Sequence, residues 1–387
     1  MTSIQWTDKV WNPLIGCSRV SAGCEHCYAE RVAHRGMTAE HRGLTVLGRK
    51  GPRWTGEVRF LPERLSEPLR WRKARMVFVN SISDLFHEGV SNEQIAAVFG
   101  VMAAAPEHTF QVLTKRPERM RDWFARMDTQ HGTEGTYVED CIGAAEEATD
   151  DGLARMKWLV QGDWPLPNVW LGVSIEDQST ADERIPLLLD TPAALRWVSY
   201  EPALGPVDFA KWLEPWTCSA CEFHGSRSDS GRVRCGDCDE DAVYAPEIGS
   251  ERCPKCGKDD GASSWVGDTC PECGSVESWS QDAGFMFPVD SGIDWIVIGG
   301  ESGPGARPFE LAWARSTIEQ CAGAGVPVFV KQLGVIPVDT RTIDGRNVPP
   351  GVNLRAVRGM RDRKGGDMSE WPEDLRIRQF PEARRAA

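Results

Sequence analysis

Three cysteines stand close together near the start of the chain, in the stretch WNPLIGCSRVSAGCEHCYAE (residues 11–30). Cys17, Cys24 and Cys27 have six residues in the first gap between them and two in the second. Zinc ribbons close with four ligands, and disulfides need pairs of cysteines. Three thiols therefore predict a metal centre whose last coordination position is open to another ligand.

Two kinds of metal centre agree with this spacing. A [4Fe–4S] cluster held by three cysteines leaves one iron open, and the known use of that iron is to bind the amino and carboxylate groups of S-adenosylmethionine (SAM). Electron transfer from the cluster then cleaves the sulfonium and makes a 5′-deoxyadenosyl radical. The alternative is a zinc site that His26, His34 or a remote ligand completes. The spacing alone favours neither.

A second group of cysteines forms four CxxC pairs. The pairs are Cys218 with Cys221, Cys235 with Cys238, Cys253 with Cys256, and Cys270 with Cys273. Thirteen residues separate the first two pairs and also the last two, a spacing close to that of zinc ribbons. We expect two structural zinc ions, with a rubredoxin-like iron centre as the alternative. The segment carries twelve acidic and six basic residues, which favours contact with a partner protein or a substrate lid over phosphate binding.

The composition is that of an ordinary globular protein, with 41% hydrophobic and 26% charged residues among 387. We expect no signal peptide, because the first residues have no basic start followed by an apolar run. The apolar runs are also too short to span a membrane. The thirteen cysteines then predict a reducing cytoplasm, with metal sites rather than disulfides. Cys141 and Cys321, which stand alone, are expected to be buried, inert thiols.

The net charge of −13 conceals one basic segment. Residues 31–75 hold twelve Lys or Arg against four Glu, with three aromatic residues between them. Such a segment can bind nucleic acid, because the cations neutralise phosphates and the rings stack on bases. A solvated surface with ordinary core aromatics is the competing interpretation. If nucleic acid binds, we expect Arg49, Lys50, Arg53 and Trp54 to contact it, because they follow the three cysteines closely.

Six short apolar runs predict the fold. They are MVFVN (76–80), FQVLT (110–114), VWLGVSIE (169–176), LRWVSYEP (195–202), DWIVIGGES (294–302) and PVFVKQLG (327–334). Buried parallel strands are apolar on both faces, and helical patterns between the runs indicate βαβ units. Ser91 with Gln94 predicts the start of one such helix, and KRPERMRDWFARM a second, basic one. We predict an α/β fold with a full or partial (β/α) barrel; a doubly wound open sheet is the rival.

The composition divides the chain into three parts. Residues 1–215 are predicted to form the first part of the barrel with the cysteine loop, and residues 286–387 its last part and a C-terminal segment. Residues 216–285, poor in aliphatic side chains, are expected to be an inserted zinc-ribbon-like module. Polar residues follow the strands, where parallel barrels place their active sites. Lys115, Arg116, Glu176, Glu201 and Lys331 are expected either to pair across this rim or to contact substrate.

Several stretches resemble the phage Gp37/Gp68 family, a three-Cys-motif group similar to radical-SAM proteins. They are IQWTDKVWNPLIGCSRVSAGCEHCYAE, FVNSISDLFHE, VLTKRPERM, WLGVSIED, YEPALGPVD, IVIGGESGPGARP and WPEDLRIRQFP, from residue 4 to residue 381. The resemblance implies a radical-SAM type barrel with a [4Fe–4S] cluster on Cys17, Cys24 and Cys27, bound SAM, and an electron donor for the cluster. The first cysteine gap is three residues wider than in the common CxxxCxxC motif.

The resemblance also implies which residues contact SAM. His26 stands where an aromatic residue commonly precedes the third cysteine. Asn80, Ser81 and Asp84 stand where the Gly-Gly-Glu element follows the second strand. Gly299, Gly300 and Glu301 spell that element after a late strand, where they would approach the ribose or the substrate; a tight turn with a satisfied carboxylate is the alternative.

Two functions follow from these patterns. The first is a SAM-dependent radical enzyme for a modification or repair reaction, with nucleic acid, protein or a small molecule as substrate. The second is a non-catalytic zinc or iron–sulfur protein that binds nucleic acid or a partner protein. The number of thiols and the open coordination position favour the first, and the wide cysteine gap keeps the second as the alternative.

Overall fold

The computed structural model describes residues 4–36, 38–131, 136–148, 164–213, 292–339 and 360–381, together with six short strands between residues 216 and 288. Two compact units are present. The first comprises residues 1–207, 295–316 and 327–387, and the second comprises residues 208–294 and 317–326.

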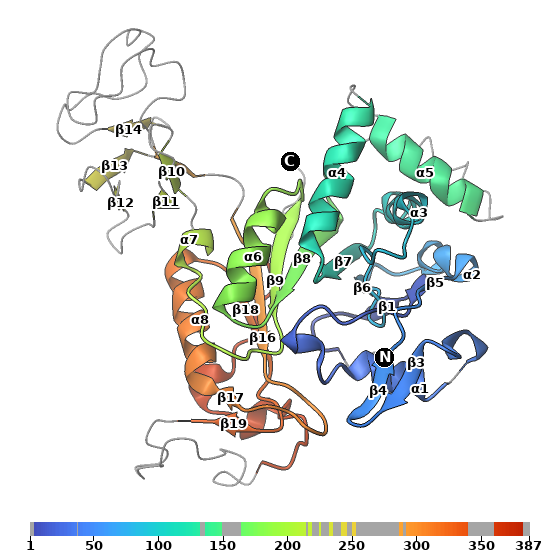
Figure 1. The fold of residues 1–387 in the computed structure, drawn as a ribbon. Helices are drawn as coiled ribbons and strands as arrows, with labels where there is room; N and C mark the ends of the chain where they lie inside the picture. Colours follow the sequence, from blue (N-terminus) through green and yellow to red (C-terminus); the bar gives the residue numbers. More distant parts are fainter. Residues whose placement is uncertain are drawn as a thin grey trace, which may run out of the picture. The chain divides into compact units, whose positions relative to one another are not determined.

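The first unit contains a seven-stranded sheet whose strands lie in the order in which they occur along the chain (Figure 1). They are β1 (Lys9–Trp11), β6 (Met76–Val79), β7 (Thr109–Thr114), β8 (Val169–Ile175), β9 (Leu195–Tyr200), β16 (Trp295–Gly299) and β18 (Val328–Gln332). Every neighbouring pair is parallel. A doubly wound sheet reverses its strand order, so the alternative prediction of a doubly wound open sheet is wrong. The prediction of a partial (β/α) barrel is confirmed, because the sheet forms a half-barrel.

Helices alternate with these strands. The principal ones are α1 (Tyr28–His34), α3 (Asn92–Ala103), α4 (Pro117–His131), α5 (Thr136–Ala148) and α6 (Gln178–Leu189). The predicted start of α3 is confirmed: Ser91 accepts from the Gln94 N–H, and the Gln94 side chain accepts from the Ser91 N–H. The basic helix predicted after β7 is α4. A second capping box, between Asp177 and Thr180, begins α6.

The long connection between β1 and β6 carries smaller elements. Strand β2 (Leu14–Ile15) pairs with β5 (Arg59–Phe60), and β3 (Thr45–Gly48) forms an antiparallel hairpin with β4 (Gly51–Trp54). Helix α2 (Pro62–Leu65) and three 3-10 turns, Ala22–Cys24, Ala39–His41 and Pro68–Arg70, complete it. In the C-terminal half, β17 (Phe309–Glu310) pairs with β19 (Pro337–Val338), and 3-10 turns span Met368–Glu370 and Glu373–Leu375.

Trp6 fills the interior of the half-barrel. Its indole packs edge-on against Phe78 of β6, Trp197 of β9 and Trp295 of β16, at centroid distances of 4.7, 5.1 and 6.3 Å. These four rings belong to one buried cluster with Trp170 and other apolar residues. Aromatic pairs of this geometry add about 0.5–1.5 kcal/mol each beyond their buried area. The N-terminal segment therefore supplies the interior packing that a closed barrel obtains from opposite strands.

The C-terminal segment covers the outer edge of β18. The Val330 N–H donates to the Ile377 carbonyl at 2.9 Å, and the Gln379 N–H donates to the Val328 carbonyl at 2.9 Å. Arg378 donates to the Gln5 side chain at 2.9 Å. An exposed strand edge invites pairing with another chain, and this segment satisfies the free groups of that edge.

The second unit includes part of the predicted insert. Helix α7 is Ala210–Leu213, and α8 (Leu311–Ala324) enters this unit at residue 317. Its strands are β10 (Trp216–Cys218), β11 (His224–Gly225), β12 (Arg232–Arg234), β13 (Asp241–Ala245), β14 (Ser250–Arg252) and β15 (Met286–Pro288). Cys218 ends β10; the other seven cysteines predicted to bind zinc lie outside the described residues.

In the part of the chain that the structure describes, no helix has both the length and the apolar character needed to cross a membrane.

A glycine on the inner face of the sheet gives a test of this packing. A Cβ at Gly172 would lie 2.5 Å from the Trp197 ring, so Gly172→Ala should destabilise the protein by about 1–3 kcal/mol through overpacking. The same change at Gly143, a position in α5 with open space, should be neutral or stabilise by about 0.5–1 kcal/mol. Urea unfolding curves of both variants measure the difference. Equal midpoints would contradict the packing of the inner face.

Candidate functional site

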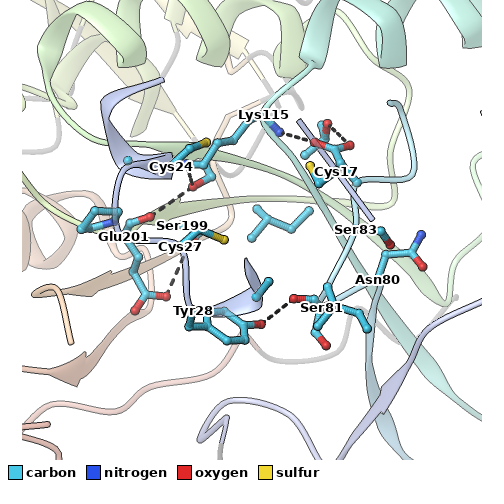
Figure 2. Close-up of a pocket in the computed structure, with 18 of the residues that line it drawn as sticks. Cys17, Cys24, Cys27, Tyr28, Asn80, Ser81, Ser83, Lys115, Ser199 and Glu201 are labelled. Atoms are coloured by element: carbon cyan, nitrogen blue, oxygen red, sulfur yellow. Dashed lines mark hydrogen bonds between the residues drawn. The ribbon is translucent and has the colours of Figure 1, made fainter. Parts of the chain in front are cut away.

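Inward-facing positions change character along each strand. Side chains alternate between the two faces of a strand, so Leu195, Trp197, Ser199 and Glu201 share one face of β9. Leu195 and Trp197 are apolar and belong to the Trp6 cluster. Ser199 and Glu201, which lie nearer the carboxyl end, line a cavity of about 270 Å³. The same change occurs at the ends of four other strands, where Asn80, Lys115, Ser174 and Lys331 line this cavity. Figure 2 shows Asn80, Lys115, Ser199 and Glu201 among the lining residues.

The three predicted cysteines line this same cavity. Figure 2 shows all three sulfur atoms beside it. Cys17 follows β2, Cys24 ends a 3-10 turn, and Cys27 is the N-cap residue of α1. The structure therefore brings the N-terminal thiol loop to the carboxyl ends of the strands, as the sequence predicts.

Two contacts fix the middle of the thiol loop. The Ser21 hydroxyl donates to Glu176 Oε1 at 2.8 Å, and Arg307 Nη2 donates to the Ala22 carbonyl at 3.0 Å. Gly23 allows this close approach, since a Cβ there would lie 2.3 Å from Glu176 Oε1. The loop is therefore held against residues that follow β8 and β16.

Burial governs the protonation of two of the thiols. It raises the pKa of the Cys17 thiol to about 12, and the Asp84 carboxylate adds to this effect. Burial also raises the pKa of Cys27, although the N–H groups of Ala29 and Glu30 at the start of α1 lower it. Both cysteines are therefore neutral thiols near pH 7, so a metal that binds here displaces protons.

The neighbours of Cys17 form a charged cluster. Arg116 Nη1 donates to Cys17 Sγ at 3.8 Å and to Asp84 Oδ2 at 3.1 Å. Nη2 of the same guanidinium donates to the Ser18 hydroxyl at 2.7 Å. A guanidinium thus contacts the first cysteine and the residue after it. Among the described residues, no three His, Cys, Asp or Glu side chains form a group that could hold a single metal ion.

Of the three residues predicted after the second strand, Asn80 alone offers an unpartnered group. Its backbone lies in the left-handed region at φ 60°, which Asn tolerates better than most residues. Its Oδ1 accepts from the Leu14 N–H at 3.3 Å, but its buried Nδ2 has no partner among the described residues. Buried polar groups are normally paired, so this amide is available to a ligand.

Asp84 and Ser81 are already engaged. Asp84 accepts from the Phe86 and Lys115 N–H groups, the Thr114 hydroxyl and Arg116. The Ser81 hydroxyl donates to Asn12, and its carbonyl accepts from the Tyr28 hydroxyl at 2.6 Å. These residues therefore fix the loops around the cavity.

The late Gly-Gly-Glu element forms a turn with a paired carboxylate. Arg307 donates to both carboxylate oxygens of Glu301, at 2.8 and 3.0 Å. Gly300 packs closely against Leu333, and a Cβ at Gly299 would lie 2.8 Å from Glu201 Oε1. Gly300 and Glu301 line the cavity, so the element lies near the thiols although its carboxylate is occupied.

The predicted rim cations and carboxylates form ion pairs. Lys115 and Arg184 both donate to the fully buried Glu176, the latter at 3.2 Å. Lys331 pairs with Glu201 at 3.0 Å, and both side chains line the cavity. Of the two interpretations offered for these residues, pairing at the rim is confirmed.

The remaining predicted residues also lie near the cavity. His26 and Trp54 line it, whereas Arg49, Lys50 and Arg53 belong to the β3–β4 hairpin and are exposed. Sequence reasoning missed Tyr28, Arg307 and Arg184. Tyr28 directly follows the third cysteine, and its half-exposed ring lines the cavity. Arg307 follows Glu301 by only six residues, and this short separation could have predicted their ion pair.

Fold and site together define an α/β half-barrel protein with a three-thiol loop at the carboxyl ends of its strands. The chain matches the family model described as "Protein of unknown function (DUF5131)" over residues 1–366, and it belongs to this family. Neither the comparison with curated proteins nor that with solved structures gave a match.

The buried ion pairs at the rim give a second test. Glu176→Ala leaves the buried Arg184 guanidinium without its carboxylate, which should lower the free energy of unfolding by about 3–5 kcal/mol. Asp122→Ala removes a carboxylate from an exposed pair with Arg121 and should cost less than about 1 kcal/mol. Urea unfolding measures both variants. A cost for Glu176→Ala no larger than for Asp122→Ala would refute the buried network.

Proposed function

We propose that this protein is an iron–sulfur, SAM-dependent radical enzyme that carries out a modification or repair reaction. The observation that supports this most is the position of Cys17, Cys24 and Cys27, which follow the first strand and line the cavity at the carboxyl ends of the sheet. The resemblance to the phage Gp37/Gp68 family agrees with it. An electron donor and a reducing, cytoplasmic location belong to the same proposal.

The donor set fits a [4Fe–4S] cluster. Thiolates suit iron–sulfur centres, and each thiolate of a cubane cluster binds a different iron, so the sulfurs need not converge on one point. Arg116 donates to Cys17 Sγ, and hydrogen bonds to sulfur tune such centres. When bound, a cluster with one open iron would donate an electron to the SAM sulfonium, the chemistry that gives a 5′-deoxyadenosyl radical.

The chain's own residues supply binding groups for such a ligand. The unpartnered Asn80 Nδ2 donates and cannot accept, so it suits a carboxylate or carbonyl oxygen rather than an ammonium. Glu201 and Lys331 present opposite charges to the cavity, which suits a zwitterionic amino-acid group. Trp6 and Phe78 provide apolar surface in the same cavity.

A non-catalytic metal-binding protein is the second candidate. The observation that favours it is that the carboxylates described in the cavity lining, those of Asp84, Glu201 and Glu301, are all ion-paired. None of them is free to act as a general base. A radical reaction on a carbon–hydrogen bond needs no such base, so the two candidates differ in whether SAM is cleaved.

The iron content tests the proposal directly. Anaerobically reconstituted protein should bind about four iron atoms per chain and convert SAM to 5′-deoxyadenosine when reduced. Cys→Ala at position 17, 24 or 27 should abolish both the iron-dependent absorbance and SAM cleavage. Iron analysis, visible absorbance and chromatography of the nucleoside are the measurements.

Two other cysteines provide the matched control. Cys141 and Cys321 are buried and lie outside the cavity lining, so Cys→Ala there should preserve the chromophore. A cluster without SAM cleavage would support the non-catalytic candidate. Zinc alone after reconstitution with iron and sulfide would refute the radical enzyme.

We also propose that the CxxC pairs at Cys218–Cys221, Cys235–Cys238, Cys253–Cys256 and Cys270–Cys273 hold two structural zinc ions. The spacing supports this, and metal binding can supply the folding free energy that a small polar segment lacks. The purified protein should contain about two zinc ions per chain. Chelation should create new protease sites between residues 218 and 273 while leaving the half-barrel intact. Unchanged protease resistance after zinc removal would argue against this.

A further inference from the structure

The β3–β4 hairpin has two distinct faces. Its register pairs Val46 with Arg53 on one face and Leu47 with Pro52 on the other. Trp54, opposite Thr45, lies on the Leu47 face, since side chains alternate along each strand. Arg49 and Lys50 form the tip of the hairpin, between its two strands. Figure 1 shows β3 and β4 side by side near α1.

This hairpin is held beside the thiol loop. Trp54, Cys27 and Val32 pack against the same buried apolar cluster, and the Trp54 backbone N–H donates to the buried Glu30 carboxylate at 3.0 Å. Lys50 at the tip pairs with Glu25, which follows Cys24, at 3.0 Å. Trp54 also lines the cavity, so the Trp54 end of the hairpin adjoins the cavity.

Cationic and apolar side chains of the hairpin are exposed together. Arg49 and Arg53 are exposed, and neither has an acidic partner among the described residues. Val46 is 56% exposed and Leu47 is 73% exposed. Tyr28, at the cavity, is 50% exposed although its hydroxyl is bonded to Ser81. Tyr28 is the first residue of α1, and both hairpin strands contact that helix. The hairpin with its exposed arginines and the start of α1 with its accessible ring therefore form one local surface, in a chain of net charge −13.

We propose that this surface binds a single-stranded polynucleotide and that the polynucleotide is the substrate of the cavity. The proposal rests on the proposed function for its reaction but not for its binding. Arg49 and Arg53 would contact phosphates, and the Tyr28 ring would stack on a base, as in other single-strand binding proteins. Charge alone would also attract an acidic protein. The exposed ring at the cavity favours a nucleic acid, because every base has a face that can stack.

The salt dependence of binding tests the arginine contacts. Fluorescent single-stranded DNA and RNA oligonucleotides are titrated with full-length, anaerobically reconstituted protein at several salt concentrations. Arg49→Gln with Arg53→Gln should weaken binding and reduce the slope of log K against log salt by about 1.4, since each single-strand phosphate contact contributes about 0.7. Arg361→Gln with Arg363→Gln is the matched control: both are exposed arginines of the C-terminal segment, and the slope should not change.

Two changes at Tyr28 test the stacking contact. Tyr28→Ala should weaken oligonucleotide binding by about tenfold or more, whereas Tyr28→Phe, which loses only the hydroxyl, should bind within about twofold of wild type. Iron content measured on each variant shows whether the thiol loop is intact. If the Ala variant loses its iron, Tyr28→Leu, which keeps apolar bulk without a ring, takes its place. Binding by the Leu variant about tenfold weaker than by the Phe variant supports the ring contact, and equal affinities of the two contradict it.

The results separate this inference from the proposed enzyme. Negligible binding of both oligonucleotides, or equal slopes for the hairpin and control variants, would overturn the polynucleotide substrate even if SAM is cleaved. That result would leave an acidic protein as the occupant to be considered. Salt-dependent binding that the hairpin variant alone weakens would support the inference even if SAM is not cleaved.

Discussion

The packing of Trp6 inside the half-barrel determines where the cavity can lie. Seven parallel strands without closure leave an interior that opposite strands do not fill, and the Trp6 indole packs there against Phe78, Trp197 and Trp295. Gly172 provides the space for Trp197 in this layer. Phe78 and Trp197 of this layer come two residues before Asn80 and Ser199, which line the cavity. The inward positions at the carboxyl ends of these strands therefore remain available for polar side chains.

Those polar side chains neutralise one another and at the same time fix the thiol loop. Glu176 accepts from Lys115 and Arg184 of the half-barrel and also from Ser21 of the loop. Arg307 likewise joins Glu301 to the Ala22 carbonyl. Buried ion pairs are costly to break singly, so the loop is positioned by interactions that the half-barrel itself requires.

The sequence predicted elements well and their partners poorly. Six strands were recognisable as apolar runs of five or more residues, whereas β1 was missed because three residues, Lys9 to Trp11, form too short a pattern. The thiols and the polar rim were predictable, because parallel strands bring their carboxyl ends together. The pairing of Lys115 with Glu176 was not, since these residues are 61 apart and meet only through the strand order. The positive φ of Asn80 carries no signal in one sequence.

The thiol loop and the basic hairpin both come from the single connection between β1 and β6. Hydrogen bonds from the first residue and from the middle of α1 join this connection to the rim: Tyr28 donates to the Ser81 carbonyl, and Arg31 donates to the Pro304 carbonyl at 3.1 Å. Glu30, on the same helix, holds Arg19 of the thiol loop and the Trp54 N–H of the hairpin. One short helix therefore couples the position of the thiols to that of the hairpin. The hairpin and the loop that carries Cys24 and Cys27 are bonded to the same carboxylate, so the packing of α1 positions both of them beside the cavity.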